Sequence, residues 1–305
     1  TLIEPLTREE FRSKSKRIPP NLGSHSHQTK TAQNVHAGFS GAKGILGRMV
    51  DALAGQDDAY RSASFSIAGN QKAVQGYRAP TFVHHRRGIA AFNQYAQIAR
   101  HYQNISALES ESIYADTWAE SLASTLISSR TIAETYAAGS TTETFNIACP
   151  SLVNCNLKDQ LKSVAQMMSV RAQSENEREV YLVQHGSYDY HQDTRDKFAK
   201  SLQVVDSSIA AFKREMVHQG LWDNVAVVSS SDFGRTLTSN GLGTDHAWAG
   251  NYFVAGGSVT GGQMHGAYPE ELSEGNPLDS GRGRMIPTMP WEVRTATPSF
   301  LLSVT

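Results

Sequence analysis

Carboxylate and imidazole side chains gather in three loops of this sequence, each beside an apolar run. Oxygen and nitrogen donors of this kind suit zinc, manganese, calcium or magnesium in differing proportions. Residues two positions apart point the same way in extended chain, so Asp189 and His191 can face one ion together. Asp and His are also common after strands as turn formers and helix caps, and spacing alone leaves that alternative open. The side chains in question are Asp189, His191, Asp232, Asp245 and His246.

Two strands and one helix are expected to position these loops. The apolar runs 179–184 and 224–229 predict the strands, and Gly220 stands where the intervening helix would end. A helical crossover makes the two strands parallel, and runs that are apolar on both faces fit a covered sheet. A third apolar run follows at 251–255. Ligands bind such sheets beyond the carboxyl ends of the strands, so we expect all three loops at one edge.

The rest of the chain predicts further helices and one more strand. The segment GSHSHQTKT (23–31) has the composition of a polar loop. His25 and His27 alternate in that segment, so they could face one site together, or they could lie in a surface loop satisfied by backbone hydrogen bonds. A strand is expected at 62–68. Helices are expected at 5–17, 43–53, 89–102, 107–138 and 157–170.

Length and composition bound the class of protein. The 305 residues and 39% hydrophobic content permit one α/β domain with a sizeable core over 1–305. Within it, 1–138 is helical and loop-rich, 157–257 is the βαβ core, and 258–305 holds glycine-rich loops. A net charge of -1 gives no electrostatic case for nucleic acid or an anionic membrane. The sequence has no run of about 18 apolar residues that would predict a membrane span.

The two cysteines, Cys149 and Cys155, lie six positions apart in a loop. A zinc site would need further Cys or His nearby, and the sequence has none within ten residues. The pair therefore predicts a disulfide, with two free thiols as the alternative. A disulfide would indicate an oxidising compartment, so the protein is expected to be secreted, extracellular or periplasmic.

Several motifs in combination resemble the domain-of-unknown-function family 1501. The family pattern reads GGFDTH, SEFGRT, GTDHG and a closing GGxxGxYP, beside HGSYDYH, SSSDFGRT, GTDHAWAG and GGQMHGAYPE here. GSHSHQTKTAQ and AKGILGRMVDAL look like its earlier blocks, so the likeness covers nearly the whole chain. The family is similar to the alkaline phosphatase and sulfatase superfamily. This implies a mostly parallel sheet sandwiched by helices, with a metal at the strand ends held by Asp189, His191, Asp232 and His246.

The sequence departs from that pattern in three places. Asp232 stands where the family commonly has Glu, and His185-Gly186 stands where Gly-Gly is usual. No strand ending in glycine-aspartate precedes Thr1, so we expect a fragment or processed product that lacks its first strand. An unpaired sheet edge would favour self-assembly or pairing with the missing N-terminal part.

The function that these residues and the resemblance predict is metal-dependent hydrolysis of sulfate or phosphate esters, with zinc, manganese or calcium as cofactor. Arg235 is the expected anion partner, because a guanidinium forks onto two oxygens of such a group. A salt bridge from Arg235 to Asp232 or Glu292 is the rival interpretation. No serine or threonine stands out as a nucleophile. The alternative function is a non-catalytic secreted or surface protein that keeps the scaffold for structure or for polysaccharide binding.

Overall fold

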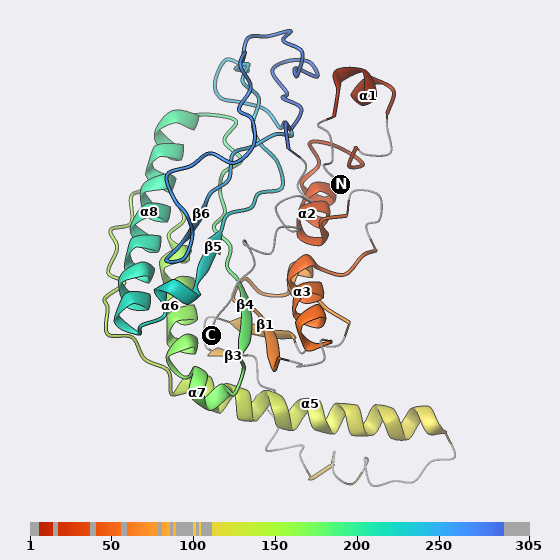
Figure 1. Cartoon of the computed structure of the whole chain (residues 1–305), viewed down its shortest axis with the longest axis vertical. Coiled ribbons are helices and arrows are strands. Elements are labelled where there is room, and N and C mark those ends of the chain that lie inside the picture. The colour runs from red at the N-terminus through yellow and green to blue at the C-terminus, as the bar shows by residue number, and fades with distance from the viewer. Residues whose placement is uncertain are drawn as a thin grey trace.

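The fold is a mixed α/β arrangement, described by a computed structural model. Helices flank a small sheet, and a set of long loops covers the end of the molecule where the sheet strands point (Figure 1). The described residues are 6–14, 18–36, 41–55, 60–77, 81–85, 88–89, 100–101, 104 and 112–289.

Four strands form the main sheet, in the order β3-β2-β1-β4. The central strand β1 pairs parallel to both β2 and β4, while β3 pairs antiparallel to β2. Phe65 of β1 is fully buried, and its ring centroid lies 5.3 Å from that of Tyr136 and 5.2 Å from that of Tyr181. This confirms the expected strand at 62–68 and a small parallel sheet. The strands are β1 (Ser62–Ser66), β2 (Thr81–His85), β3 (Gly88–Ile89) and β4 (Arg178–Leu182).

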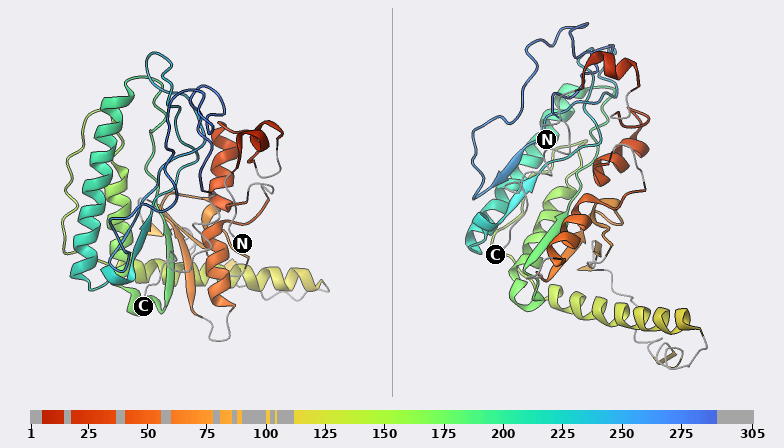
Figure 2. Two further views of the ribbon diagram at one scale, coloured as in Figure 1. Left: turned by 45° about the horizontal axis from the view of Figure 1, so that its top comes forward. Right: turned by 45° about the vertical axis from the view of Figure 1, so that its right-hand side comes forward.

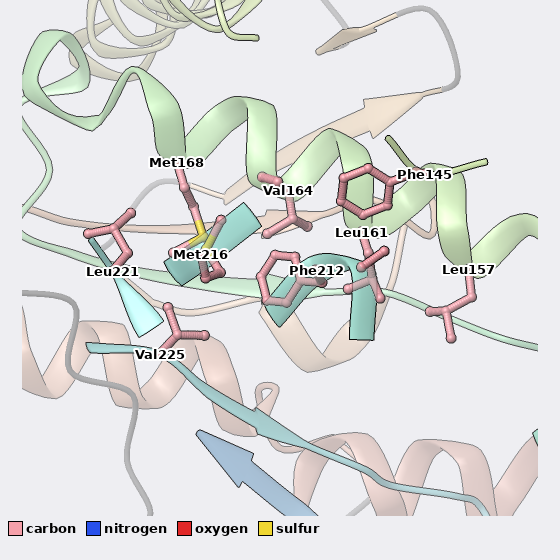
Figure 3. Packing of buried hydrophobic residues seen from close by; sticks show 11 residues of the cluster. Phe145, Leu157, Leu161, Val164, Met168, Phe212, Met216, Leu221 and Val225 are labelled. Carbon is pink, nitrogen blue, oxygen red and sulfur yellow. The ribbon is translucent and has the colours of Figure 1, made fainter. Parts of the chain in front are cut away.

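Helices cover the sheet on both faces. α3 (Ile45–Ala54) lies against β1 and β4 on one face, and α6 (Asn156–Ser169) and α8 (Thr194–His218) pack side by side on the other (Figures 1 and 2). Figure 3 shows how Phe212 and Met216 of α8 meet apolar side chains of α6 in the main hydrophobic core. The predicted helices at 43–53 and 157–170 are confirmed.

The second predicted strand pairs differently from the expectation. β5 (Ala226–Val228) bonds antiparallel to β6 (Val254–Gly256), and β4 takes β1 as its parallel neighbour. The prediction that the two runs form parallel strands of one sheet is therefore wrong for the described residues, because β4 and β5 belong to separate sheets. The prediction that both runs contribute to the core is confirmed, because Val225 and Val227 pack with Tyr181 in one hydrophobic cluster. An apolar run indicates that a strand is buried, but it does not indicate which strand pairs with it.

The remaining elements frame this core. The long helix α5 (Ile113–Ala137) extends away from the body and is attached through Tyr136 near its C-terminal end (Figure 2). It confirms most of the helix expected at 107–138, whereas nearly all of the one expected at 89–102 lies outside the described residues. The shorter elements are α1 (Arg8–Arg12), α2 (His25–Asn34), η1 (Lys72–Val74), α7 (Arg171–Ser174) and η2 (Trp222–Asn224).

Two further sequence predictions can be compared with the structure. Cys149 and Cys155 form a disulfide with their Cα atoms 5.9 Å apart, which confirms the predicted pair. Across the described part of the chain, no helix combines the length and the apolar character that crossing a bilayer requires.

Candidate metal centre

Backbone pairing between the loops determines where the candidate ligands lie. Arg235 and His246 form an isolated antiparallel bridge, so the loop after β5 runs beside the loop that carries His246. Gly234 donates its N–H to the Trp248 carbonyl at 3.0 Å. A Cβ at Gly234 would lie 1.8 Å from the Ala249 carbonyl oxygen, so only glycine permits this close approach.

Three imidazoles meet the Asp189 carboxylate. The Nε2 atoms of His191 and His246 lie 3.0 and 2.9 Å from Asp189 Oδ1. His25 Nε2 lies 3.3 Å from the other oxygen, Oδ2. The ligand atoms of His25, Asp189 and His246 all lie within 4.8 Å of one another.

Each imidazole turns its Nδ1 atom outward to an acceptor. His25 Nδ1 donates to Asp232 Oδ2 at 2.5 Å, and His246 Nδ1 donates to the Gly23 carbonyl at 2.7 Å. His191 Nδ1 lies 3.6 Å from Asp245 Oδ1. The hydrogen bonds at His25 and His246 fix the tautomer and aim the opposite nitrogen inward, as in metal-binding histidines, whereas 3.6 Å at His191 is too long for a hydrogen bond. In this geometry Asp232 and Asp245 lie behind His25 and His191 as supporting carboxylates.

The local charges keep Asp189 ionised. Partial burial raises the pKa of Asp189, but hydrogen bonds from Arg235 and His246 outweigh this effect and lower its pKa to about 2. The hydrogen bond to Asp232 raises the pKa of His25 above its usual value, against the smaller effect of burial. The ring of buried Phe233 lies 4.6 Å from that of His25 and 4.7 Å from that of His246, which gives the cluster an apolar floor.

Arg235 ties the loops together. Its Nη1 donates to Asp189 Oδ1 at 2.5 Å, and its Nη2 donates to the carbonyls of Tyr190 and Thr244 at 3.2 and 2.5 Å. Its Nε donates to the Thr244 hydroxyl at 3.1 Å. Four of the five N–H groups of a guanidinium are thus engaged within the described residues, which leaves one for an anion. The rival interpretation was a salt bridge from Arg235 to Asp232 or Glu292. Arg235 forms its salt bridge with Asp189 instead of Asp232, and Glu292 lies outside the described residues.

The structure brings His25 into the cluster and leaves His27 out of it. The segment expected to be a loop is the helix α2, which begins directly after Ser24. In a helix, residues two positions apart face different sides. His25 therefore points to Asp189, whereas His27 Nδ1 lies 3.1 Å from the Ser24 hydroxyl. Serine is common directly before a helix, so Ser24 is the residue from which this helix start could have been predicted.

The fold and the cluster define a mixed α/β protein with histidine and aspartate side chains converging beyond the ends of its strands. The chain belongs to the family described as protein of unknown function (DUF1501), whose model matches residues 4–276. Neither the curated proteins nor the solved structures give a match to this chain.

Proposed function

We propose that this protein is a metal-dependent hydrolase of sulfate or phosphate esters. The observation that carries the proposal is the arrangement of three imidazoles, each with Nδ1 facing an outer acceptor and Nε2 facing Asp189. A relation to the alkaline phosphatase and sulfatase superfamily is part of the same proposal. It is supported by parallel strands with the ligand loop directly beyond the end of β4.

The donor set fits a small divalent metal. Asp189 Oδ1, His191 Nε2 and His246 Nε2 form a triangle with edges of 2.9, 3.0 and 3.2 Å. Ligand atoms around tetrahedral zinc lie about 3.3 Å apart, given bonds of about 2.0 Å. Two imidazoles and a carboxylate favour zinc or manganese over calcium, which prefers oxygen ligands. His25 Nε2 lies 3.3 Å from the other oxygen of Asp189, Oδ2, and offers a further donor.

Hydrogen bonding within the triangle is the alternative to a metal. The Nε2 atoms of His191 and His246 lie 3.2 Å apart, so one ring nitrogen can donate to the lone pair of the other. A metal instead needs a lone pair on both Nε2 atoms. The hydrogen bond from His246 Nδ1 to the Gly23 carbonyl favours that form of His246.

A divalent metal at this position would polarise an ester oxygen and lower the pKa of an attacking water. The protein supplies the supporting charges. Asp189, Asp232 and Asp245 balance three nearby arginines, namely Arg235, Arg282 and Arg284, whose guanidinium groups bond Asp189, Asp245 and the His246 carbonyl. With a divalent ion the centre then carries a net positive charge, which favours an anionic ester over a neutral one.

Arg282 is the second side chain suited to hold the anion. Its Nη2 donates to Asp245 Oδ2 at 2.8 Å, and that is its only partner within the described residues. It is 62% exposed, so most of its N–H groups face solvent. The residue has a φ of 59° between two glycines that also have positive φ, an uncommon conformation that directs its side chain toward Asp245. Arg235 orients the carboxylate ligand, and Arg282 is free to meet the substrate.

A hollow beside Thr244 offers room for the organic part of the ester. It has a volume of about 450 Å³ and is lined by the first turn of α8 and by the loop 237–244. Its charged lining residues are Arg195, Asp193 and Asp196, and Leu242 adds an apolar side chain. With two acidic residues against one basic residue, this hollow has no excess of positive charge, so the preference for an anionic group rests on the arginines of the centre.

The disulfide supports a place for the protein in an oxidising compartment. Cystine bridges persist in secreted, extracellular and periplasmic proteins and are rare in reducing cytosol. A secreted, extracellular or periplasmic location is therefore part of the proposal.

The test is hydrolysis of 4-nitrophenyl phosphate and 4-nitrophenyl sulfate by protein loaded with zinc or manganese. Activity should disappear on chelation and fall by at least about 100-fold in Asp189→Asn, because the carboxylate ligand is lost. Arg282→Gln should raise KM with little change in kcat, since it removes a substrate contact.

The control His27→Ala should behave as wild type. Metal binding without turnover of either ester would favour the alternative, a non-catalytic binding or structural protein.

A further inference from the structure

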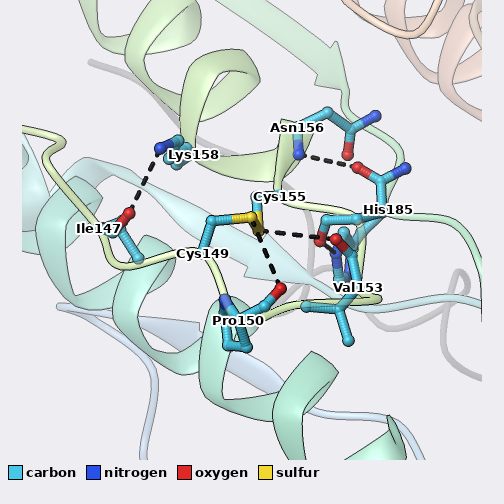
Figure 4. Close-up of a disulfide and its surroundings, with 9 residues drawn as sticks. Ile147, Cys149, Pro150, Val153, Cys155, Asn156, Lys158 and His185 are labelled. Carbon is cyan, nitrogen blue, oxygen red and sulfur yellow. Dashed lines mark hydrogen bonds between the residues drawn. A yellow bond between two sulfur atoms is a disulfide. The ribbon is translucent and has the colours of Figure 1, made fainter.

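The Cys149–Cys155 disulfide closes a small ring directly before α6. Cys155 is the residue that precedes the first turn of this helix, and Asn154 Oδ1 accepts the backbone N–H of Asn156 at 2.9 Å. Lys158 of α6 donates to the Ile147 carbonyl at 3.3 Å, on the chain leading into the ring. The ring is thus fixed to the start of a core helix (Figure 4).

His185 connects that ring to the loop of the candidate metal centre. Its Nε2 donates to the Asn154 carbonyl at 2.6 Å. A carbonyl only accepts, so the ring proton is on Nε2 and Nδ1 accepts from the Tyr188 hydroxyl at 2.7 Å. Tyr188 directly precedes Asp189. Two hydrogen bonds therefore lead from the disulfide ring to the neighbour of the central carboxylate.

The loop needs such a restraint. Ser187, between His185 and Tyr188, has a φ of 75°, which non-glycine residues adopt only when surrounding contacts hold them there. The strand end before it is held separately, because Gln184 donates its N–H to Gln160 Oε1 at 2.8 Å and its carbonyl accepts from Gln160 Nε2 at 2.7 Å. The contribution of His185 is therefore confined to the part of the loop beyond Gln184.

We infer that His185 is a positioning residue that clamps the loop 185–191 to the Cys149–Cys155 ring, so that the disulfide sets the metal affinity of the Asp189 centre. The effect on metal binding rests on the proposed function, whereas the clamp itself does not. Reduction by a phosphine transfers two electrons to the S–S bond and breaks it; water supplies the oxygen of the phosphine oxide and the two protons of the thiols. The opened ring no longer fixes the Asn154 carbonyl, and the loop is released.

The experiment compares wild type with His185→Ala, His185→Gln, the double variant Cys149→Ser with Cys155→Ser, and wild type reduced by a phosphine. The control is His218→Ala, an exposed histidine at the end of α8. Two quantities are measured: amide hydrogen exchange of 186–191 in the metal-free protein, and the zinc dissociation constant by competition with a chelator. Cobalt absorption spectra report whether the ligand geometry changes.

In His185→Ala, the double serine variant and the reduced protein, the amide hydrogens of 186–191 should exchange faster, and zinc should bind about 10- to 100-fold more weakly. Combining His185→Ala with the serine pair should cause no further change in exchange or zinc affinity, because both act through one contact. His185→Gln should keep part of the wild-type protection and zinc affinity, since its amide can donate to the Asn154 carbonyl. Unchanged exchange in these variants overturns the clamp even if zinc binds. Faster exchange in a protein that binds no zinc keeps the clamp and removes the proposed metal function. Faster exchange with wild-type zinc affinity overturns the link between disulfide and metal.

Discussion

Asp189 accepts a hydrogen bond from the Arg235 guanidinium and faces the imidazoles of His25, His191 and His246. The sequence predicted Asp189, His191 and His246 as neighbours, because residue types and loop positions after strands carry that information. It predicted Asp232 as a ligand, and the structure places its carboxylate on the outer nitrogen of His25. His25 lies 207 residues from Asp232, and neither spacing nor composition could join them.

The comparison of His25 with His27 tests the assignment of ligands. His25→Ala should weaken zinc binding by about 10- to 100-fold, because it removes a donor and leaves Asp232 without its partner. His27→Ala should leave the dissociation constant unchanged, since this side chain bonds Ser24 outside the cluster. Isothermal titration with zinc measures both. An equal loss in the two variants would mean that α2 as a whole, rather than one imidazole, supports the site.

The sequence predicted helices well where the spacing of apolar residues determines them. It predicted elements poorly where contacts with distant segments determine the structure. The apolar stripe of α3 and the core-facing side of α8 follow from sequence spacing. The helix α2 was missed because its composition is polar throughout, and its stability comes from contacts such as the buried side chain of Gln28. The pairing of β5 with β6 was missed because strand partners are set by tertiary packing.

The attachment of α5 to the sheet depends on a buried polar contact. Tyr136 donates its hydroxyl to Glu179 Oε1 at 2.6 Å, and Glu179 also accepts from Tyr181 and Asn176. Tyr136→Phe should lower the free energy of unfolding by about 1–3 kcal/mol, because a buried carboxylate loses one donor. Urea denaturation measures it. Tyr114→Phe, on the exposed part of the same helix, is the control and should have no effect. Equal stability of the two variants would show that this contact does not hold α5.

In the molecule as a whole, loops far apart in the sequence bond to one another beside the candidate centre, and the side chains of His25 and Asp189 stay 47% and 44% exposed. Arg284 donates to the His246 carbonyl at 3.2 Å, and Arg8 of α1 donates to the Gly275 carbonyl at 3.3 Å. Asp279, which is buried, holds the C-terminal loop by accepting the N–H groups of Gly275 and Gly281 at 2.9 and 2.8 Å. Composition predicted glycine-rich loops here, but their closure depends on contacts between distant segments that periodicity does not encode.

Asp279 should give the fold part of its sensitivity to acid. Burial raises the pKa of its carboxyl, but backbone hydrogen bonds from Gly275, Gly281 and Gly283 outweigh it and hold the pKa below its usual value. Its stabilising contribution is therefore complete above the unfolded pKa of about 3.9 and is lost as pH falls through the lower folded pKa. Asp279→Asn should be less stable at pH 7 and lose less stability between pH 5 and pH 2. Urea unfolding over this range measures both. Parallel stability curves for the two proteins would contradict this role.

The central claim, that three imidazoles and Asp189 hold one divalent metal, is tested most directly by elemental analysis. Wild-type protein dialysed against zinc or manganese and then against metal-free buffer should retain about one ion per chain. Among the described residues one such cluster forms, from His25, Asp189 and His246, and His191 Nε2 lies 3.0 Å from Asp189 Oδ1. Asp189→Ala, with its fold verified by circular dichroism, should retain almost none. A wild-type protein that keeps no metal, or a variant that keeps as much as wild type, would contradict the account.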